Sequence, residues 1–135
     1  MAGPAREPNL FLRLLKWAQR QDENFLTESL AVILELLLNS DRAPTRAVGG
    51  RVVAALTDGF ITVDAESTGM LEIRTQVTTT EGRPDLELRL PDRLAVCEVK
   101  FESGLRLGQL EGYREYLRSS GFPQTQLILL TKYPP

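Results

Sequence analysis

The 135-residue sequence contains no histidine and only one cysteine, Cys97. Without histidine, the chain has no His-ligated zinc site and no Ser–His or Cys–His nucleophile pair. A single cysteine excludes an intramolecular disulfide framework and fits a reducing compartment, which predicts a cytoplasmic protein. Because free cysteines are usually buried, we expect Cys97 to pack in the core.

Long hydrophobic runs are also missing. The longest apolar stretch, residues 30–38, is interrupted by Glu35. It is far shorter than the roughly 20 residues that a helix needs to span a bilayer. Residues 1–8 lack the apolar segment of a signal peptide. We therefore expect no membrane partner.

The chain has no excess of positive charge, since 16 Lys and Arg face 18 Asp and Glu, for a net charge of −2. Any contact with nucleic acid must come from a local basic patch or from another domain. The length, with 42% hydrophobic and 25% charged residues, fits one compact domain over residues 1–135. This domain could also be the N-terminal part of a longer protein.

Apolar residues recur at helical spacing in the first part of the chain. They predict a helix over residues 9–21 and a second helix that starts at residue 22 or 24 and ends at 38. A weaker helix is expected over 46–57, despite a Gly-Gly pair inside it. A turn at Asp-Gly then precedes a short strand over 60–63.

The second part of the chain is dominated by strand patterns. The order is three strands after the helices, then one helix, then one strand. A turn at 91–93 joins two of the strands into a hairpin. The apolar last strand is expected to be buried on both faces. The expected strands cover 70–79, 85–90, 94–101 and 126–131, and the helix covers 105–118.

Strict alternation marks the first strand of the hairpin, whereas the second strand is nearly all apolar until Glu98 and Lys100. A two-residue period places Asp85, Glu87 and Arg89 on one face of the first strand, with leucines on the other. In the second strand the same period places Glu98 and Lys100 on one face. Because the two strands are adjacent, we expect Asp85, Glu98 and Lys100 to face the same way.

The motif "RPDLEL", followed by "CEVK" in the next strand, resembles the PD-(D/E)xK nuclease superfamily. The segment "ENFLTESLAVILE" looks like the first core helix of that family, which bears a glutamate, here Glu28. The segment "GQLEGYREYL" resembles the helix after the motif, with Gln109 and a nearby aromatic residue, Tyr113. The resemblance covers residues 24–131, although residues 43–67 match no core element. It implies an α/β, restriction-endonuclease-like fold with an αβββαβ core, in which helices flank a mixed central sheet.

The resemblance also implies a Mg²⁺-dependent nuclease that hydrolyses phosphodiester bonds of DNA, or less favourably of RNA, with Mn²⁺ able to substitute. Asp85, Glu98 and the backbone carbonyl of Val99 would hold the ion, because Mg²⁺ prefers oxygen ligands. Lys100 would orient the attacking water or stabilise developing negative charge. Glu28 would hold a water at the metal or help to bind a second ion, and Gln109 would position water or phosphate.

Each of these residues also has a structural interpretation. Glu98 and Lys100 could form the solvated face of an edge strand, and Asp85 could be a turn residue. Glu28 could be a first-turn glutamate that the helix dipole favours. Gln109 could simply pack on Tyr113. We expect Glu87 to be a solvated strand residue. Most arginines are expected to be surface charges, with some in contact with phosphates; they include Arg83, Arg89, Arg106, Arg114 and Arg118.

Two other functions remain open at this point. One is a catalytically inactive module of the nuclease fold that serves nucleic-acid binding or assembly. The other is an unrelated α+β interaction domain. For the nuclease, cutting both strands of a duplex needs two active sites, so a homodimer or an additional domain is expected as a partner.

Overall fold

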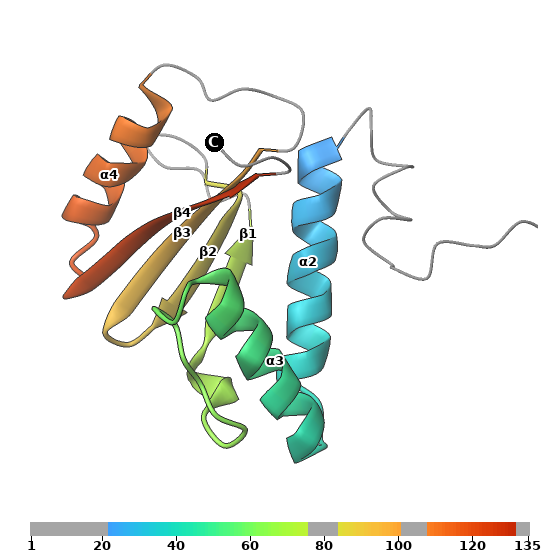
Figure 1. Ribbon diagram of the computed structural model, residues 1–135. Helices are drawn as coiled ribbons and strands as arrows, with labels where there is room; N and C mark the ends of the chain where they lie inside the picture. Colours follow the sequence, from blue (N-terminus) through green and yellow to red (C-terminus); the bar gives the residue numbers. More distant parts are fainter. Residues whose placement is uncertain (1–21, 76–83, 101–107, 132–135) are drawn as a thin grey trace, which may run out of the picture.

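A computed structural model describes residues 22–75, 84–100 and 108–131 of the chain (Figure 1). The predicted helix over residues 9–21 lies outside these residues. The described part is α/β, with three α-helices, a short 3₁₀ helix and a four-stranded mixed sheet. In chain order the elements are α2 (Asp22–Leu38), α3 (Ala43–Leu56), η1 (Thr68–Met70), β1 (Glu72–Thr75), β2 (Leu86–Leu90), β3 (Arg93–Lys100), α4 (Gln109–Ser119) and β4 (Gln124–Thr131).

The sheet has the strand order β1-β2-β3-β4. β1, β2 and β3 form an antiparallel meander, and the predicted hairpin between β2 and β3 is confirmed, with Pro91 and Asp92 in its turn. β4 pairs parallel to β3. A parallel neighbour requires a crossover connection, and α4 lies in that connection.

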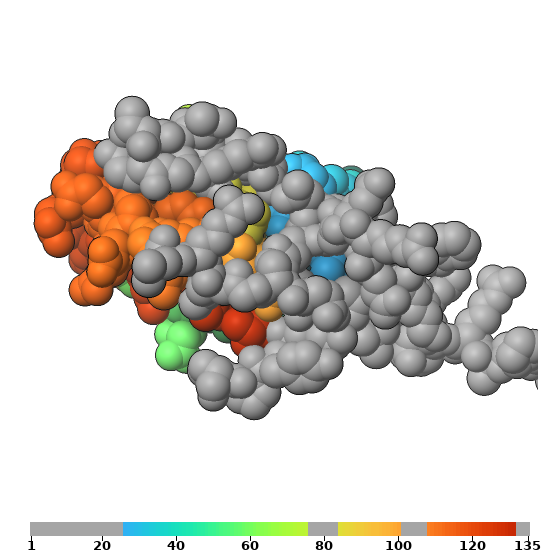
Figure 2. Space-filling model, turned by 90° about the horizontal axis from the view of Figure 1, so that it is seen from above, coloured from blue at the N-terminus to red at the C-terminus, as the bar shows by residue number. Residues whose placement is uncertain are grey.

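The two faces of the sheet carry separate cores, as the alternating pattern of β2 requires. On one face, leucines of β2 and Cys97 of β3 pack against Leu34 and Leu38 of α2 and Val53 of α3. On the other face, Leu94 and Val96 of β3 pack against Tyr113 and Leu117 of α4. Figure 1 shows α4 on one side of the sheet and α2 with α3 on the other. From above, in Figure 2, the described residues of α4 and α2 again lie on opposite sides.

The weak helix expected over 46–57 is confirmed as α3, with a start three residues earlier. Pro44 is accepted in the first turn because the amides there have no partner within the helix. Gly50 is needed inside the helix, since a Cβ atom would lie 2.3 Å from the carbonyl oxygen of Val63. The glycine that weakens the helical pattern therefore allows the following loop to pack directly on α3.

The strand expected over 60–63 is wrong, because these residues form a turn and an irregular segment. Their backbone is bonded to the end of α3 instead of to a strand. The amide of Phe60 donates to the carbonyl of Thr57 (3.0 Å), and the amide of Ile61 donates to the Thr57 hydroxyl (3.0 Å). Ile61 is fully buried in the core next to α3. The apolar pattern thus reflects one inward side chain in a loop.

The strand predicted over 70–79 begins two residues later than its β-branched composition suggested. Met70 belongs to η1, and β1 begins at Glu72. Residues 76–79 lie outside the described residues. The helix expected over 105–118 is confirmed as α4, which begins at Gln109, with residues 105–107 also outside the described residues.

The last strand is confirmed as β4, but its expected burial on both faces is wrong. Leu127 packs towards α4 and Ile128 towards the opposite core, yet residues 126–130 are only half-buried. The reason is position, since β4 is at the edge of the described sheet. Among the described helices, none is long and apolar enough to cross a membrane.

Candidate functional site

The hairpin register brings Asp85 and Glu98 to neighbouring positions. Leu86 pairs with Cys97, so the next residues outward are Asp85 on one strand and Glu98 on the other. The amide of Val99 donates a 2.8 Å hydrogen bond to Asp85 Oδ2, which fixes this carboxylate across the strands. Both acidic residues are buried, with exposures of 8% for Asp85 and 2% for Glu98. Asp85 is therefore more than a turn residue.

Lys100 joins the same group two residues further along β3. Its Nζ lies 3.0 Å from Glu98 Oε1, and its side chain is only 12% exposed. β3 is an interior strand, with β2 on one side and β4 on the other. The alternative of a solvated face on an edge strand is therefore wrong for Glu98 and Lys100.

Gln109 approaches Glu98 from the first turn of α4. It follows Gly108, whose φ of 80° is a left-handed conformation that glycine adopts without strain. The Gln109 Nε2 group donates to Glu98 Oε1 at 2.7 Å and to the Tyr113 hydroxyl at 3.2 Å. The expected packing of Gln109 with Tyr113 thus coexists with a direct bond to the acidic site, because one amide group carries two protons.

Glu98 Oε2 is a buried oxygen without a hydrogen-bond partner, and no other buried side-chain nitrogen or oxygen of the described residues shares this condition. Its sister oxygen Oε1 accepts from both Lys100 and Gln109. A buried carboxylate oxygen without a partner is costly, since it has lost its hydration. A cation beside Oε2 would remove this cost.

Tyr113 is a buried phenol close to the two acids. Burial raises its pKa to about 12, and the charges of Glu98 and Asp85 act in the same direction. The phenol is therefore protonated at neutral pH and available as a hydrogen-bond donor. Cys97 is buried as expected, and burial with the charge of Asp85 raises the pKa of its thiol to about 12.

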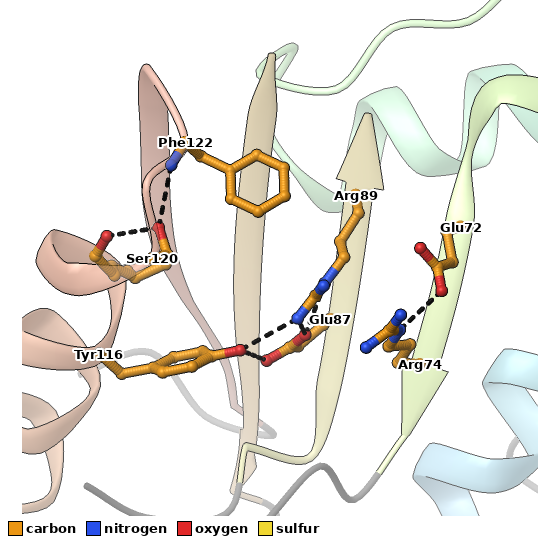
Figure 3. Close-up of polar contacts among 8 residues, drawn as sticks. Glu72, Arg74, Glu87, Arg89, Tyr116, Ser120 and Phe122 are labelled. Atoms are coloured by element: carbon orange, nitrogen blue, oxygen red, sulfur yellow. Dashed lines mark hydrogen bonds and ion pairs between the residues drawn. The ribbon is translucent and has the colours of Figure 1, made fainter. Parts of the chain in front are cut away.

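Beside this site, a second polar cluster links β2 to α4 (Figure 3). The Tyr116 hydroxyl donates to Glu87 Oε1 (2.5 Å), and Arg89 donates to Glu87 Oε2 (2.9 Å) and to the Tyr116 hydroxyl (3.1 Å). The Arg89 guanidinium also lies over the ring of Phe122, 5.7 Å from its centroid. The expectation of a solvated Glu87 is wrong, because α4 covers this face and the carboxylate is fully buried.

The polar role of α4 was underestimated from the sequence. Gln109, Tyr113 and Tyr116 follow one another at spacings of four and three, which place them on one side of a helix. Together with acidic residues at alternate positions of the facing strands, this spacing is a signal for polar contacts between helix and sheet. This signal for polar contacts appears only when the helix and the facing strands are considered together.

Glu28 lies apart from this bonding network. It is exposed on α2, which packs on the face of the sheet opposite α4. Within the described part of the chain, no hydrogen bond or ion pair joins Glu28 to Asp85, Glu98 or Lys100. Its predicted role at a metal ion stays a prediction.

The donor atoms suit a hard cation with few protein ligands. Among the described residues, no group of three or more His, Cys, Asp or Glu is arranged to hold a metal, so the site offers two carboxylates. Glu98 Oε2 has no hydrogen-bond partner among the described residues, and Asp85 and the backbone carbonyl of Val99 are the other ligands that the sequence predicts. Mg²⁺ fits this set because it keeps several waters in its coordination shell.

Relatives give no independent assignment for these residues. Comparisons with protein-family models, with curated protein sequences and with solved structures each found no significant match for this chain.

Proposed function

We propose that the chain is a divalent-metal-dependent nuclease that hydrolyses phosphodiester bonds of DNA, built on a restriction-endonuclease-like fold. The observed succession of helix, three strands, helix and strand supports the fold, with α3 as an addition to that core. The observation that carries the function is Glu98, buried beside Asp85 and Lys100, with one carboxylate oxygen that has no hydrogen-bond partner among the described residues.

Asp85, Glu98 and the carbonyl of Val99 would hold Mg²⁺, with Mn²⁺ as a substitute. The bound ion would supply charge neutralisation at the phosphate and activation of the attacking water. Hydrolysis adds this water to phosphorus and breaks the bond from phosphorus to the leaving sugar oxygen, which takes up a proton.

The residues around the carboxylates would supply positive charge and hold the carboxylate of Glu98 in position. Lys100 is held 3.0 Å from Glu98 Oε1, so its ammonium sits beside the place where negative charge develops. It would orient the water or stabilise that charge. Gln109 fixes the other side of Oε1, and Tyr113 holds Gln109. This arrangement leaves Oε2 without a hydrogen-bond partner among the described residues, so it could serve as a ligand to a bound ion.

The proposal is tested with Asp85→Asn and Glu98→Gln, which keep the size of each side chain. Each change should lower Mg²⁺-dependent cleavage of a DNA substrate by about 100-fold or more, the loss typical of removing one group that stabilises a transition state. Glu35→Gln, an exposed carboxylate on α2, is the matched control and should cleave like the unchanged protein. Parallel assays on RNA of the same sequence separate the two substrates.

Circular dichroism must show that the variants are folded. If Asp85→Asn and Glu98→Gln cleave as fast as the control, the site assignment is wrong. If the unchanged protein binds Mg²⁺ and DNA but never cleaves, the chain is instead an inactive module of this fold.

A further inference from the structure

A groove runs between the C-terminal half of α4 and the start of β4. Its volume is about 360 Å³, which is within the range of ligand sites. It is lined by Arg114, Leu117, Arg118, Thr125, Gln126 and Leu127. α4 and β4 lie side by side along this stretch in Figure 1.

The lining carries positive charge and no carboxylate. Arg114 forms no hydrogen bond or ion pair with the described residues. Among the described residues, Arg118 pairs with Glu115 alone, at 3.0 Å, and both side chains are largely exposed. Such an exposed pair contributes little and is readily exchanged for a stronger partner. In a chain with a net charge of −2, this concentration of cationic groups in one groove favours an anionic ligand.

The groove lies on the same side of the sheet as the candidate active site, since Leu117 and Leu127 belong to the core under α4. Along α4, Arg114 and Arg118 are about 8 Å and 14 Å from Gln109, at 1.5 Å per residue. Along β4, Gln126 is about 10 Å from Leu129, at 3.3 Å per residue. Leu129 is the register partner of Glu98. The groove therefore lies on the same side of the sheet as the acidic site, nearer to the C-terminal end of α4.

The chemistry of the lining matches a polymer of phosphates and sugars. Arginine binds a phosphate through two parallel hydrogen bonds. Thr125 and Gln126 add a hydroxyl and an amide, which bond phosphate and sugar oxygens without reading the sequence. The partly buried Leu127 offers apolar surface to the sugar carbons between phosphates. A groove bounded by one helix and one strand suits a single nucleic-acid strand better than a duplex.

We propose that this groove binds the phosphate backbone of a single DNA strand on one side of the scissile bond. Its link to cleavage depends on the proposed nuclease function, whereas the binding itself does not. Arg114 and Arg118 are the main contacts, and they hold two phosphates along α4 while the next part of the strand reaches Glu98 and Lys100.

Binding is tested in EDTA, where metal-dependent cleavage cannot occur. The probe is a fluorescein-labelled single-stranded DNA of about 12 nucleotides, a common site size for such proteins, measured by anisotropy over a range of salt concentrations. The variant is Arg114→Gln with Arg118→Gln. The matched control is Arg42→Gln with Arg51→Gln, two exposed arginines of the α3 region that give the same change in net charge.

The groove variant should bind the probe about 10-fold more weakly at low salt. The slope of log K against log salt should fall by about 1.4, the value for two lost phosphate contacts on a single strand. The α3 control should change affinity by less than about twofold. Arg114→Lys with Arg118→Lys should keep most of the salt slope, because it keeps both charges.

Equal losses in the groove variant and the α3 control would overturn the proposal, because only net charge would then matter. Unchanged binding in the groove variant would also overturn it. Tighter binding of an RNA probe of the same sequence, or of dextran sulfate, would reject DNA as the ligand. Loss of cleavage in Asp85→Asn with normal DNA binding supports the groove, whereas absence of cleavage in the unchanged protein rejects only the nuclease.

Discussion

At the scale of single residues, the site contains buried charges that have few polar partners. Glu98 is 2% exposed, and its carboxylate oxygen Oε1 lies 3.0 Å from Lys100 Nζ and accepts a hydrogen bond from Gln109 Nε2. Removing one member of a buried ion pair costs more than the pair itself contributes, because the other charge remains buried. The free energy of unfolding should therefore change when one of the buried charges at this site is removed.

Lys100→Met should lower the free energy of unfolding by about 2–4 kcal/mol in EDTA, because it leaves Glu98 buried without a counter-charge. Glu98→Gln with Lys100→Met should recover at least half of this loss, since the double variant buries no charge. Urea denaturation of the single and double variants measures both values. A double variant no more stable than Lys100→Met would contradict this account.

Cys97 should be inert in the folded protein. Its folded pKa of about 12 exceeds the usual 9.0 because of burial first and the charge of Asp85 second. The neutral thiol therefore contributes stability that is complete below about pH 9 and is lost as the pH rises towards 12. Iodoacetamide at pH 8 should label Cys97 only after denaturation, and Cys97→Ala should flatten the fall in stability above pH 9. Rapid labelling of the native protein would contradict the prediction.

At the scale of elements, α4 is the part that completes the site. Its first turn delivers Gln109 to Glu98, and its third delivers Tyr116 to the buried Glu87 of β2. Since Glu87 is fully buried, the second contact holds the helix in register with the sheet while the first reaches the acidic residues. Gly108 before the helix and the parallel return through β4 set its direction.

Tyr116→Phe should lower the free energy of unfolding by about 1–3 kcal/mol, because a buried carboxylate loses a hydrogen bond. Arg118→Gln on the same helix breaks only an exposed ion pair and should cost less than about 0.5 kcal/mol. Thermal or urea unfolding of the two variants provides the comparison. Equal stability of the two variants would show that the Glu87 contact does not anchor α4.

At the scale of the whole molecule, the sheet separates two cores, and the acidic residues lie on the α4 side. The described residues offer one such site per chain, whereas cutting a duplex on both strands requires two. The net charge of −2 gives no general attraction to a polyanion, so binding depends on local groups such as Arg114 and Arg118.

The unchanged chain should therefore cut both strands of duplex DNA only as a symmetric dimer or with additional DNA-binding sequence. Activity should fall steeply with salt, because each phosphate contact releases counterions. Cleavage in low salt with Mg²⁺ or Mn²⁺, combined with light scattering to determine mass, measures both. Efficient double-strand cutting by a proven monomer would be incompatible with this prediction.

Local patterns were sufficient where one element decided the outcome. The turn at 91–93 predicted the hairpin, and the two-residue period of its strands predicted the common orientation of Asp85, Glu98 and Lys100. The strand predicted over 60–63 from its local pattern is wrong, because the amide of Ile61 donates to the hydroxyl of Thr57 at the end of α3. A short apolar run does not reveal whether its hydrogen bonds go to a strand or to a helix end.

The sequence by itself determined the element order, the buried Cys97 and the acidic positions on one side of the hairpin, since these follow from periodicity and composition. Only the tertiary structure decided that Glu87 is buried and that, within the described part of the chain, Glu98 Oε2 has no partner and β4 is an edge strand. Each of these depends on which element covers which face. That choice is made by packing between segments far apart in the chain, and no local pattern encodes it.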